Sequence, residues 1–264
     1  MWEITAYDSL TLGVRYDHYS DFGGTTNPRA GYVHEFKNEM IFKLLYGQAF
    51  RAPNNNELYS KIGALGNPDI DPETIKTFET SLEVPFLKYY TMTVNYFHNQ
   101  IDDIIRLDTS VPSPYPFINV KGESVIDGVE TELTCNFGKN RYGYLNISYQ
   151  NSEDDTGQDL PYVASWMGNV GYNHEFFGML NTNVNLYWTG ERTRANGDTR
   201  DKAPSATLVD LTLILKNIYK TLEIRGSFFN LFDEDYVDPS TITTVTYDLP
   251  QHGRMFLAEI RYSF

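Results

Sequence analysis

The C-terminal segment 256–264 alternates between apolar and more polar side chains, and this pattern constrains the fold more than any other feature of the chain. The other face of the predicted strand is mixed and includes Glu259 and Arg261. A strand with one apolar face, one mixed face and an aromatic end suits a transmembrane β-barrel. An edge strand of a water-soluble sandwich alternates in the same way, so the remaining sequence must distinguish the two folds. The apolar face carries Phe256, Ala258, Ile260, Tyr262 and Phe264.

The composition favours strands over helices. Aromatic residues make up 15% of the chain, with 20 Tyr and 16 Phe, although hydrophobic residues reach only 41%. Aromatic side chains suit strands and membrane interfaces. No apolar run approaches the roughly 18 residues of a transmembrane helix, whereas a barrel strand needs only about ten alternating residues. The composition therefore excludes a transmembrane helix and leaves a barrel open.

Alternation recurs along the whole chain, in about twelve segments that we predict to be strands. An even number is typical of bacterial up-and-down barrels. Where the alternation is clearest, the apolar face carries no charged side chain, in keeping with a cost of about 2–4 kcal/mol for a basic residue facing lipid at the midplane. The predicted strands are 8–19, 27–36, 39–51, 73–84, 89–107, 117–136, 141–151, 163–175, 180–191, 205–216, 221–231 and 253–264.

The connections between these strands alternate between long and short. Outer-membrane barrels have short periplasmic turns at one end and long extracellular loops at the other. A soluble meander has no reason to place every long loop at one end, so the alternation favours the membrane barrel. The long connections are predicted near 20–26, 52–72, 108–116, 152–162, 192–204 and 232–252, and the short ones near 37–38, 85–88, 137–140, 176–179 and 217–220.

Charge and motifs exclude several function classes. The net charge of −14 argues against a nucleic-acid partner, because phosphates require clusters of Lys and Arg. Cys135 is the single cysteine, so no intrachain disulfide can form. Two His-Glu pairs, at His34 and His174, begin like a zinc-protease motif but lack its second histidine. No nucleophile elbow or phosphate-binding loop is present. We therefore expect neither an enzyme nor a resident cofactor or metal.

Several segments, in order along nearly the whole chain, resemble the TonB-dependent outer-membrane receptors. The central one reads Tyr-Gly-Gln-Ala-Phe-Arg-Ala-Pro over residues 46–53. Each match alone is weak, but their number and order identify the chain as a member of this family. The matching segments are 10–17, 46–53, 56–59, 66–73, 128–132, 229–236 and 250–264.

The resemblance implies an all-β, antiparallel transmembrane barrel in the outer membrane of a Gram-negative bacterium. Barrels of this family have about 22 strands and a plugged lumen. We therefore expect residues 1–264 to form a single domain segment, the C-terminal part of such a barrel, lacking the plug and the TonB-engaging segment. On this view Met1 is an internal or an introduced start, and the segment alone is not a native transporter. The implied partners are the TonB complex, outer-membrane lipid and lipopolysaccharide, and the barrel assembly machinery.

The implied function is energy-dependent uptake of an iron complex, most often a ferric siderophore, which would bind at the extracellular mouth. Anionic, aromatic siderophores suit Arg and Tyr partners. For Arg51 the alternative is an ion pair with a carboxylate that fixes the fold. For Tyr115, Arg192 and Arg194 the alternative is an ordinary solvated loop residue. The ligand-binding candidates are Arg51, Asn54, Asn55, Glu57, Tyr59, Tyr115, Arg192 and Arg194.

Other functions remain open at this stage. The segments 50–53 and 67–70 resemble those of haem receptors, but no histidine lies between them, which leaves Tyr59 as the axial ligand that haem iron needs. A cobalamin receptor of the same family, a passive pore or structural barrel, and a soluble β-sheet binding protein are the further alternatives. The family's C-terminal pattern also implies a role in membrane insertion and assembly for Phe256, Ile260, Tyr262 and Phe264.

Overall fold

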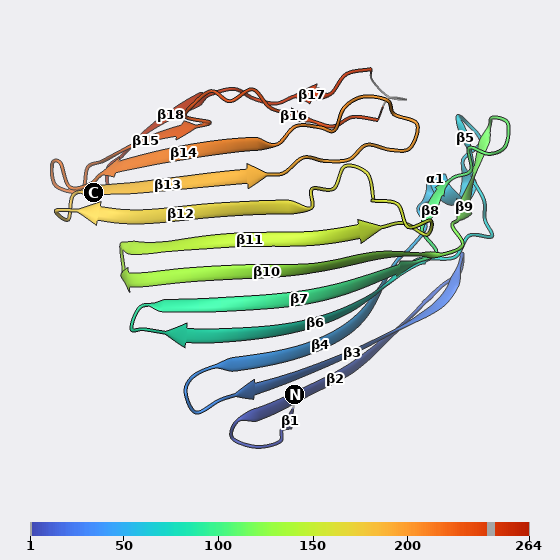
Figure 1. Ribbon diagram of the computed structural model, residues 1–264, viewed down its shortest axis with the longest axis horizontal. Coiled ribbons are helices and arrows are strands. Elements are labelled where there is room, and N and C mark those ends of the chain that lie inside the picture. The colour runs from blue at the N-terminus through green and yellow to red at the C-terminus, as the bar shows by residue number, and fades with distance from the viewer. Residues whose placement is uncertain (1, 242–245, 264) are drawn as a thin grey trace. The chain divides into compact units, whose positions relative to one another are not determined.

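A computed structural model describes residues 2–241 and 246–263, so the prediction for Phe264 lies outside the described residues. Its main element is a sheet of 13 strands, in which each strand neighbours the next long strand along the chain (Figure 1). The sheet consists, in order, of β1 (Trp2–Glu3), β2 (Asp8–Tyr19), β3 (Gly23–Glu35), β4 (Ile41–Arg51), β6 (Glu73–Phe86), β7 (Tyr90–Asp102), β10 (Glu123–Gly138), β11 (Arg141–Glu153), β12 (Trp166–Phe176), β13 (Leu180–Thr189), β14 (Ala206–Leu215), β15 (Glu223–Phe229) and β18 (Met255–Arg261).

The remaining elements lie in the long connections. One short helix, α1 (Asn55–Tyr59), follows β4. A three-stranded sheet combines β5 (Ala64–Leu65), β9 (Tyr115–Asn119) and β8 (Ile105–Leu107), with β5 parallel and β8 antiparallel to β9. The strands β16 (Val237–Asp238) and β17 (Leu249–Pro250) form an antiparallel pair. Within the described ranges, no helix is both long and apolar enough to cross a membrane.

The chain divides into two compact units. Unit 1 comprises Met1–Leu82, Asn95–Gly128 and Asn151–Asp159, and unit 2 comprises Glu83–Val94, Val129–Gln150 and Leu160–Phe264. Each unit contains strands of the large sheet as well as long connections.

Each of the predicted strands is present, and the principal differences lie at the strand ends. The strand predicted at 89–107 is wrong in its last part, because β7 ends at Asp102 and the chain turns at Asp103, whose φ of +57° lies in the left-handed region. The Asn119 amide donates to the carbonyl oxygen of Asp103 at 2.7 Å and holds this turn. Residues 105–107 and 115–119 therefore form the separate pair β8 and β9, and β10 begins only at Glu123 rather than at 117.

The long connection predicted near 20–26 is wrong. Strand β2 continues to Tyr19 and β3 begins at Gly23, so three residues join them. Gly23 turns the chain with a φ of +87°. The ring of Tyr16 lies so close to Gly24 that a Cβ there would be 2.5 Å from the tyrosine hydroxyl. The run of Gly and Thr resembled a loop in composition, but its glycines allow a tight turn and close packing against a tyrosine.

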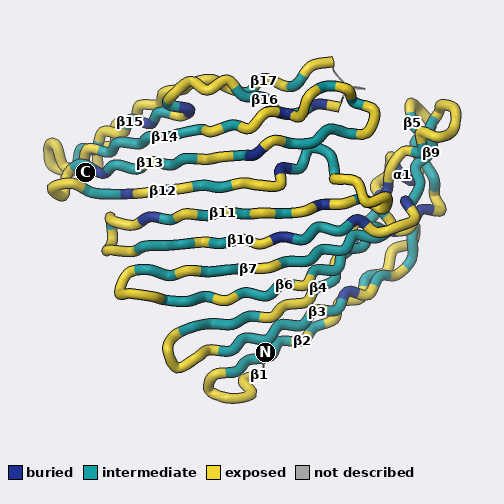
Figure 2. Tube along the Cα trace, viewed as in Figure 1, coloured by how far each residue is buried: buried dark blue, intermediate teal, exposed yellow. Residues whose placement is uncertain are grey.

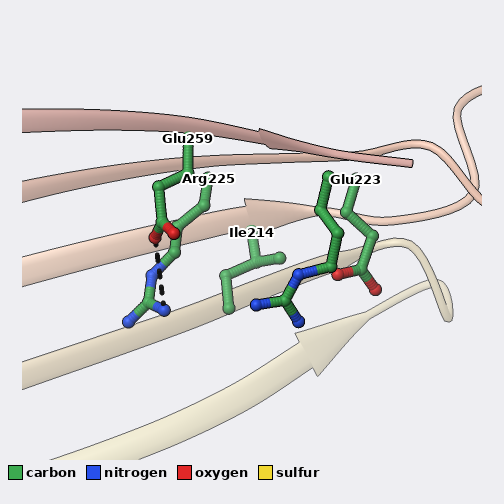
Figure 3. Close-up of a pocket in the computed structure, with 5 residues that line it drawn as sticks. Ile214, Glu223, Arg225 and Glu259 are labelled. Atoms are coloured by element: carbon green, nitrogen blue, oxygen red, sulfur yellow. Dashed lines mark ion pairs between the residues drawn. The ribbon is translucent and has the colours of Figure 1, made fainter. Parts of the chain in front are cut away.

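The two faces of the sheet in unit 2 match the predicted alternation. Across β14, β15 and β18, Leu211, Phe228 and Phe256 lie in one row of the register, and the Phe228 and Phe256 ring centroids are 4.8 Å apart. On the opposite face Arg225 lies beside Glu259, with 3.6 Å between Nη1 and Oε2 (Figure 3). Cross-strand pairs of aromatic rings and of opposite charges both stabilise a sheet. The apolar and charged residues therefore segregate over neighbouring strands as well as along each one.

Burial in the sheet is inverted relative to a water-soluble protein. Along the apolar face of β2 in unit 1, the exposed fraction of Val14 is 72% and that of Tyr16 is 67%. In unit 2, polar residues such as Ser227 and the hydrogen-bonded pair Asn173 and Asn181 are buried instead. Figure 2 shows that buried stretches along the strands are short, and that most of the sheet is exposed or intermediate. Among the described residues, the buried apolar side chains all lie outside the large sheet; they are Leu58, Ile70, Ile105, Val120, Ala164 and Ala203. A sheet that exposes its apolar face suits lipid as its surroundings.

Candidate functional site

The long connections in unit 1 join β4 to β6 and β7 to β10, and they share a small apolar core. Leu58 of α1 packs with Ile70, Ile105 and Phe117. The Asn67 amide donates to the carbonyl oxygen of Phe117 at 3.0 Å, which ties the two connections together. Because antiparallel strands reverse direction, the end of β4, the start of β6, the end of β7 and the start of β10 lie at the same end of the strands. This end is the candidate ligand-binding region of unit 1.

Arg51, the last residue of β4, is the centre of an ion-pair cluster. Its Nε and Nη2 donate to the two carboxylate oxygens of Glu73, at 2.5 and 2.7 Å. Its Nη1 donates to both carboxylate oxygens of Glu57, at 3.1 and 3.0 Å. Glu73 also accepts from the Ile105 backbone N–H at 2.8 Å. We call Arg51, Glu57 and Glu73 the Arg51 cluster, and its formal charge is −1.

The local sequence explains why Glu57 reaches this cluster. The Asn54 side chain accepts hydrogen bonds from the backbone N–H groups of Asn56 and Glu57, and the Glu57 carboxylate accepts one from the Asn54 N–H. This reciprocal arrangement is a capping box, which stabilises the start of a helix. Asn54 and Glu57 are therefore held by the helix they begin, and Arg51 is held by the carboxylates.

The structure separates the predicted ligand-binding residues of unit 1 into two groups. Arg51, Asn54 and Glu57 lie together and bind one another, which for Arg51 is the fold-fixing ion pair raised as the alternative. Asn55 and Tyr59 are exposed on α1, with an exposed fraction of 52% for Tyr59. Tyr115 is half-buried in β9 beside Ala64 of β5. Their binding of a ligand stays a prediction.

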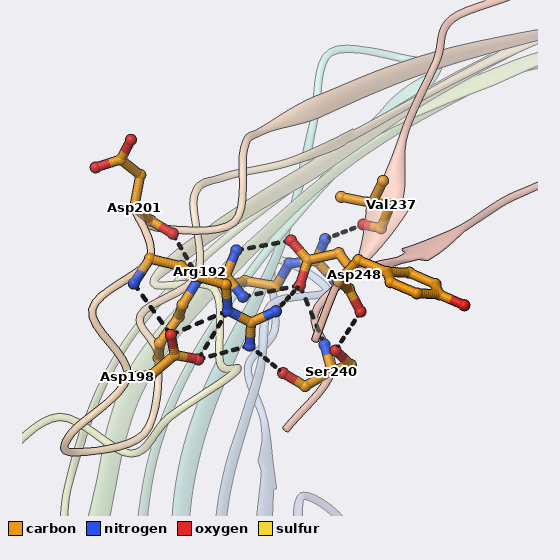
Figure 4. Close-up of polar contacts among 9 residues, drawn as sticks. Arg192, Asp198, Asp201, Val237, Ser240 and Asp248 are labelled. Atoms are coloured by element: carbon orange, nitrogen blue, oxygen red, sulfur yellow. Dashed lines mark hydrogen bonds and ion pairs between the residues drawn. The ribbon is translucent and has the colours of Figure 1, made fainter. Parts of the chain in front are cut away.

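A second ion-pair cluster joins two long connections of unit 2, residues 190–205 and 230–254. Arg194 donates to both carboxylate oxygens of Asp248, at 2.8 and 2.7 Å (Figure 4). Arg200 donates to the same Asp248 at 3.3 Å and to both oxygens of Asp198, with 2.6 Å for the shortest of these contacts. Arg200 also donates to the Ser240 carbonyl oxygen at 2.7 Å. We call these five residues the Arg194 network.

The Arg194 network is electrically balanced, and two of its charged side chains are almost fully buried. The exposed fraction of the Arg194 side chain is 7% and that of Asp198 is 1%. Hydrogen bonds from Arg194 lower the pKa of Asp248 to about 2, and hydrogen bonds from Arg200 lower the pKa of Asp198 to about 2. The same contacts raise the pKa of both arginines. All four groups therefore stay charged across the physiological range.

Arg192 makes a separate link between the same two connections. Its Nη1 donates to Asp238 at 3.1 Å and its Nη2 donates to the Val237 carbonyl oxygen at 2.7 Å. Its backbone pairs with Ala203. Arg192 and Arg194 are thus not solvated loop residues, the alternative considered for them, because carboxylates of the neighbouring connection bind them.

Sequence reasoning missed the partners of these arginines. Glu73, Asp198, Arg200 and Asp248 were not among the candidates, although each forms part of a cluster. Segment 192–201 mixes Arg and Asp at high density, and this was the available signal. The signal does not say which residue pairs with which, because Asp248 lies 54 positions from Arg194.

Comparison with known proteins gives one consistent family. The family model described as "TonB dependent receptor-like, beta-barrel" matches residues 1–231. The iron-regulated outer membrane virulence protein of Vibrio cholerae is 24% identical over 289 aligned residues, which cover 100% of this chain and 43% of that protein. The chain thus spans less than half the length of the curated relatives it matches.

Solved structures with similar folds cover almost the whole chain. A mutant of the ferric enterobactin receptor PfeA from Pseudomonas aeruginosa has a TM-score of 0.81 at 19% identity, covering 98% of this chain and 43% of that one. The siderophore receptor PirA from Acinetobacter baumannii has a TM-score of 0.81 at 19% identity, covering 99% and 44%. The copper transporter OprC has a TM-score of 0.77 at 17% identity, covering 100% and 46%. At these identities the likeness shows the fold.

Proposed function

The chain belongs to the TonB-dependent receptor-like β-barrel family, and we propose that the protein containing it is a receptor for energy-dependent uptake of a ferric siderophore. Members of this family are receptors and transporters of the outer membrane of Gram-negative bacteria, not enzymes. The exposed apolar face of the strands suits that location. In this proposal the 264 residues supply part of the barrel wall and part of the ligand-binding mouth.

The observation that carries the proposal is the agreement between relatives. A ferric enterobactin receptor and a siderophore receptor share the fold over 98% and 99% of the chain, and an iron-regulated protein aligns along all of it. The likeness to a copper transporter supports copper as a second candidate. Haem and cobalamin remain the further alternatives. Energy transfer through TonB would involve other parts of the complete protein, and insertion would involve the assembly machinery and the surrounding lipid and lipopolysaccharide.

Within unit 1 we assign ligand contact to the exposed residues rather than to the ion-paired ones. The Arg51 guanidinium is bound by two carboxylates, so it has no free charge for an anionic siderophore. Asn55 and Tyr59 project from α1 without such partners in the described structure, and a tyrosine ring can stack on an aromatic ligand. The Arg51 cluster then serves to hold α1 in position.

Uptake by the complete receptor tests the proposal. The receptor is expressed in a Gram-negative strain that lacks its own siderophore receptors. Uptake is then measured for ferric catecholate and ferric hydroxamate siderophores, haem, cobalamin and copper. We expect accumulation of a ferric siderophore that an uncoupler of the proton gradient abolishes. Accumulation of copper or haem alone, or uptake that persists with the uncoupler, contradicts the proposal.

The ligand contact of Tyr59 has its own test. Tyr59→Ala in the complete receptor should weaken siderophore binding about tenfold if the ring stacks on the ligand. The matched control is Lys61→Ala, which changes an exposed residue of the same connection. Equal binding by the two variants and the unmodified receptor removes Tyr59 from the site. A Soret band that forms with haem and is lost in Tyr59→Phe would favour the haem alternative.

A further inference from the structure

Four of the five histidines follow a tyrosine by two residues. Residues two apart in a strand lie on the same face, so each tyrosine lies beside its histidine. In every case this is the face that carries the exposed apolar side chains, as the exposure of Tyr16, Tyr96 and Tyr172 shows. The pairs are Tyr16 and His18, Tyr32 and His34, Tyr96 and His98, and Tyr172 and His174.

Two of the pairs contain their own anion, supplied by the neighbouring strand. Asp8 Oδ1 accepts from the Tyr32 hydroxyl at 2.6 Å and lies 2.7 Å from His34 Nδ1. Likewise, Asp127 Oδ1 accepts from the Tyr96 hydroxyl at 2.9 Å and lies 2.7 Å from His98 Nδ1. The repeated arrangement is thus a tyrosine hydroxyl and an imidazole that converge on one anionic oxygen.

The pair in unit 2, Tyr172 and His174, has a cation where the pairs at His34 and His98 have a carboxylate. Arg141 of β11 lies directly opposite His174 of β12 in the register. The Tyr172 hydroxyl lies 3.2 Å from His174 Nδ1. When that hydroxyl donates to Nδ1, the ring proton is on Nε2, which is then a donor for a further group. Arg141 is exposed and has no ion pair among the described residues.

The carboxylate next to His174 in the sequence does not supply the anion. Glu175 adjoins His174 in the strand and therefore lies on the opposite face. Its Oε2 accepts from Lys216 Nζ and from the Asn140 amide, both at 2.8 Å. Arg141 and His174 thus form a cationic, donor-rich position, and within the described ranges neither is paired with a carboxylate.

The surroundings of this position indicate where the anion comes from. Arg141 follows the two-residue turn between β10 and β11, and short turns mark the periplasmic end of an outer-membrane barrel. The Phe176 ring centroid is 4.3 Å from that of His174 on the same apolar face. Aromatic residues at the end of such a face lie at the level of lipid headgroups. The anion available there, beside hydrocarbon, is a lipid phosphate.

We propose that Arg141 and His174, with Tyr172 orienting the imidazole, bind the phosphate of a phospholipid in the periplasmic leaflet. Arginine suits phosphate because its guanidinium can donate two hydrogen bonds at once. In the two other clusters an aspartate takes the place of this phosphate. The inference depends on the outer-membrane location and is independent of which iron complex is transported.

Lipid binding to the complete receptor tests this inference. The purified receptor in detergent is titrated with phosphatidylglycerol, and bound lipid is counted by native mass spectrometry. We expect Arg141→Gln to weaken binding about tenfold and His174→Gln to weaken it less. Heat-modifiable gel mobility establishes that each variant is folded, and siderophore uptake by Arg141→Gln should be retained.

The matched control is Lys88→Gln. Lys88 lies in another short turn, over the Tyr89 ring at 5.1 Å, and has no Tyr-x-His pair beside it. Its change should leave lipid binding unaltered. Unchanged binding in Arg141→Gln, or equal losses in Arg141→Gln and Lys88→Gln, overturns the inference. Competition by glycerol phosphate as strong as that of the lipid would show a site for free phosphate and would also overturn it.

Discussion

The Arg51 cluster and the Arg194 network use the same chemistry for different tasks. In unit 1 one arginine, half-exposed at 44%, joins two carboxylates and leaves a net negative charge. In unit 2 two arginines join two aspartates, and the side chains of Arg194 and Asp198 are almost fully buried. The Arg51 cluster fixes a helix beside two strand ends. The Arg194 network fixes one long connection against another.

This comparison shows that an arginine at the end of a strand is not by itself a ligand site. All three arginines predicted to bind ligand are bound by carboxylates of this chain. Burial then decides how much each contact stabilises. Exposed pairs contribute little, whereas removal of one partner of a buried pair leaves an uncompensated charge. The Arg194 network should therefore be the more sensitive of the two.

The largest effect is expected for Asp248→Ala. The change leaves the buried Arg194 guanidinium without its carboxylate, so the connection at residues 190–205 should open more often. Amide hydrogen exchange in that segment should rise about a hundredfold in the complete receptor.

The matched control for Asp248→Ala is Asp201→Ala. Asp201 contributes only its carbonyl oxygen to Arg194, and Figure 4 shows its carboxylate directed away from the network. Exchange should be unchanged in this variant. Equal exchange in the two variants would show that the network does not hold the connection.

Acid should release the Arg194 network only at low pH. The pKa values of Asp198 and Asp248 are lowered to about 2, below the usual value of about 3.9. Their contribution to stability is complete above the usual value and is lost as the pH falls through about 2. Pepsin should therefore cleave segment 190–205 slowly at about pH 4 and faster toward about pH 2. Rapid cleavage already at the higher pH would contradict the assignment, and Asp248→Asn should be cleaved rapidly throughout.

A smaller effect is expected for Arg51→Ala. The two carboxylates lose their common cation, but the Arg51 side chain is half-exposed, so water can enter its place and solvate them. Hydrogen exchange over segment 52–72 should rise about tenfold. Lys61→Ala in the same segment should leave it unchanged. A rise as large as that of Asp248→Ala would erase the distinction between the two clusters.

The smallest effect is expected for Asn54→Ala. The helix loses its capping side chain, which contributes about 1 kcal/mol. Exchange of the Asn56 and Glu57 amides should rise, while the remainder of unit 1 is unaffected. Asn55→Ala, a change at the next position, is the control and should leave these amides protected.

The sequence predicted the strands well because alternation is a local property. Most of the long strands lie close to their predicted ranges, and apolar side chains such as Val14 alternate with polar ones along them, as predicted. The errors occurred where tertiary contacts override composition, as at Gly23 and at Asp103. The helix α1 could have been predicted from the Asn54 and Glu57 spacing, which we assigned to ligand binding instead.

The partners in the two ion-pair clusters were harder to predict from the sequence than the strands. Arg51 and its two carboxylates lie within 22 positions of one another, inside the segments that resemble the family. The Arg194 network joins residues up to 54 positions apart in connections that have no periodicity. No pattern within one connection specifies a partner in another, so only the folded structure pairs Arg194 with Asp248.

The accessibility of the two strand faces is the measurement that tests the central claim most directly. Single cysteines at Leu12 and Leu213, and at Thr11 and Thr212, are spin-labelled in the complete receptor in liposomes, with Cys135 replaced by serine. We expect oxygen, which concentrates in lipid, to relax the labels at Leu12 and Leu213 much more than those at Thr11 and Thr212. Equal relaxation on both faces would contradict a barrel wall with lipid on its apolar side.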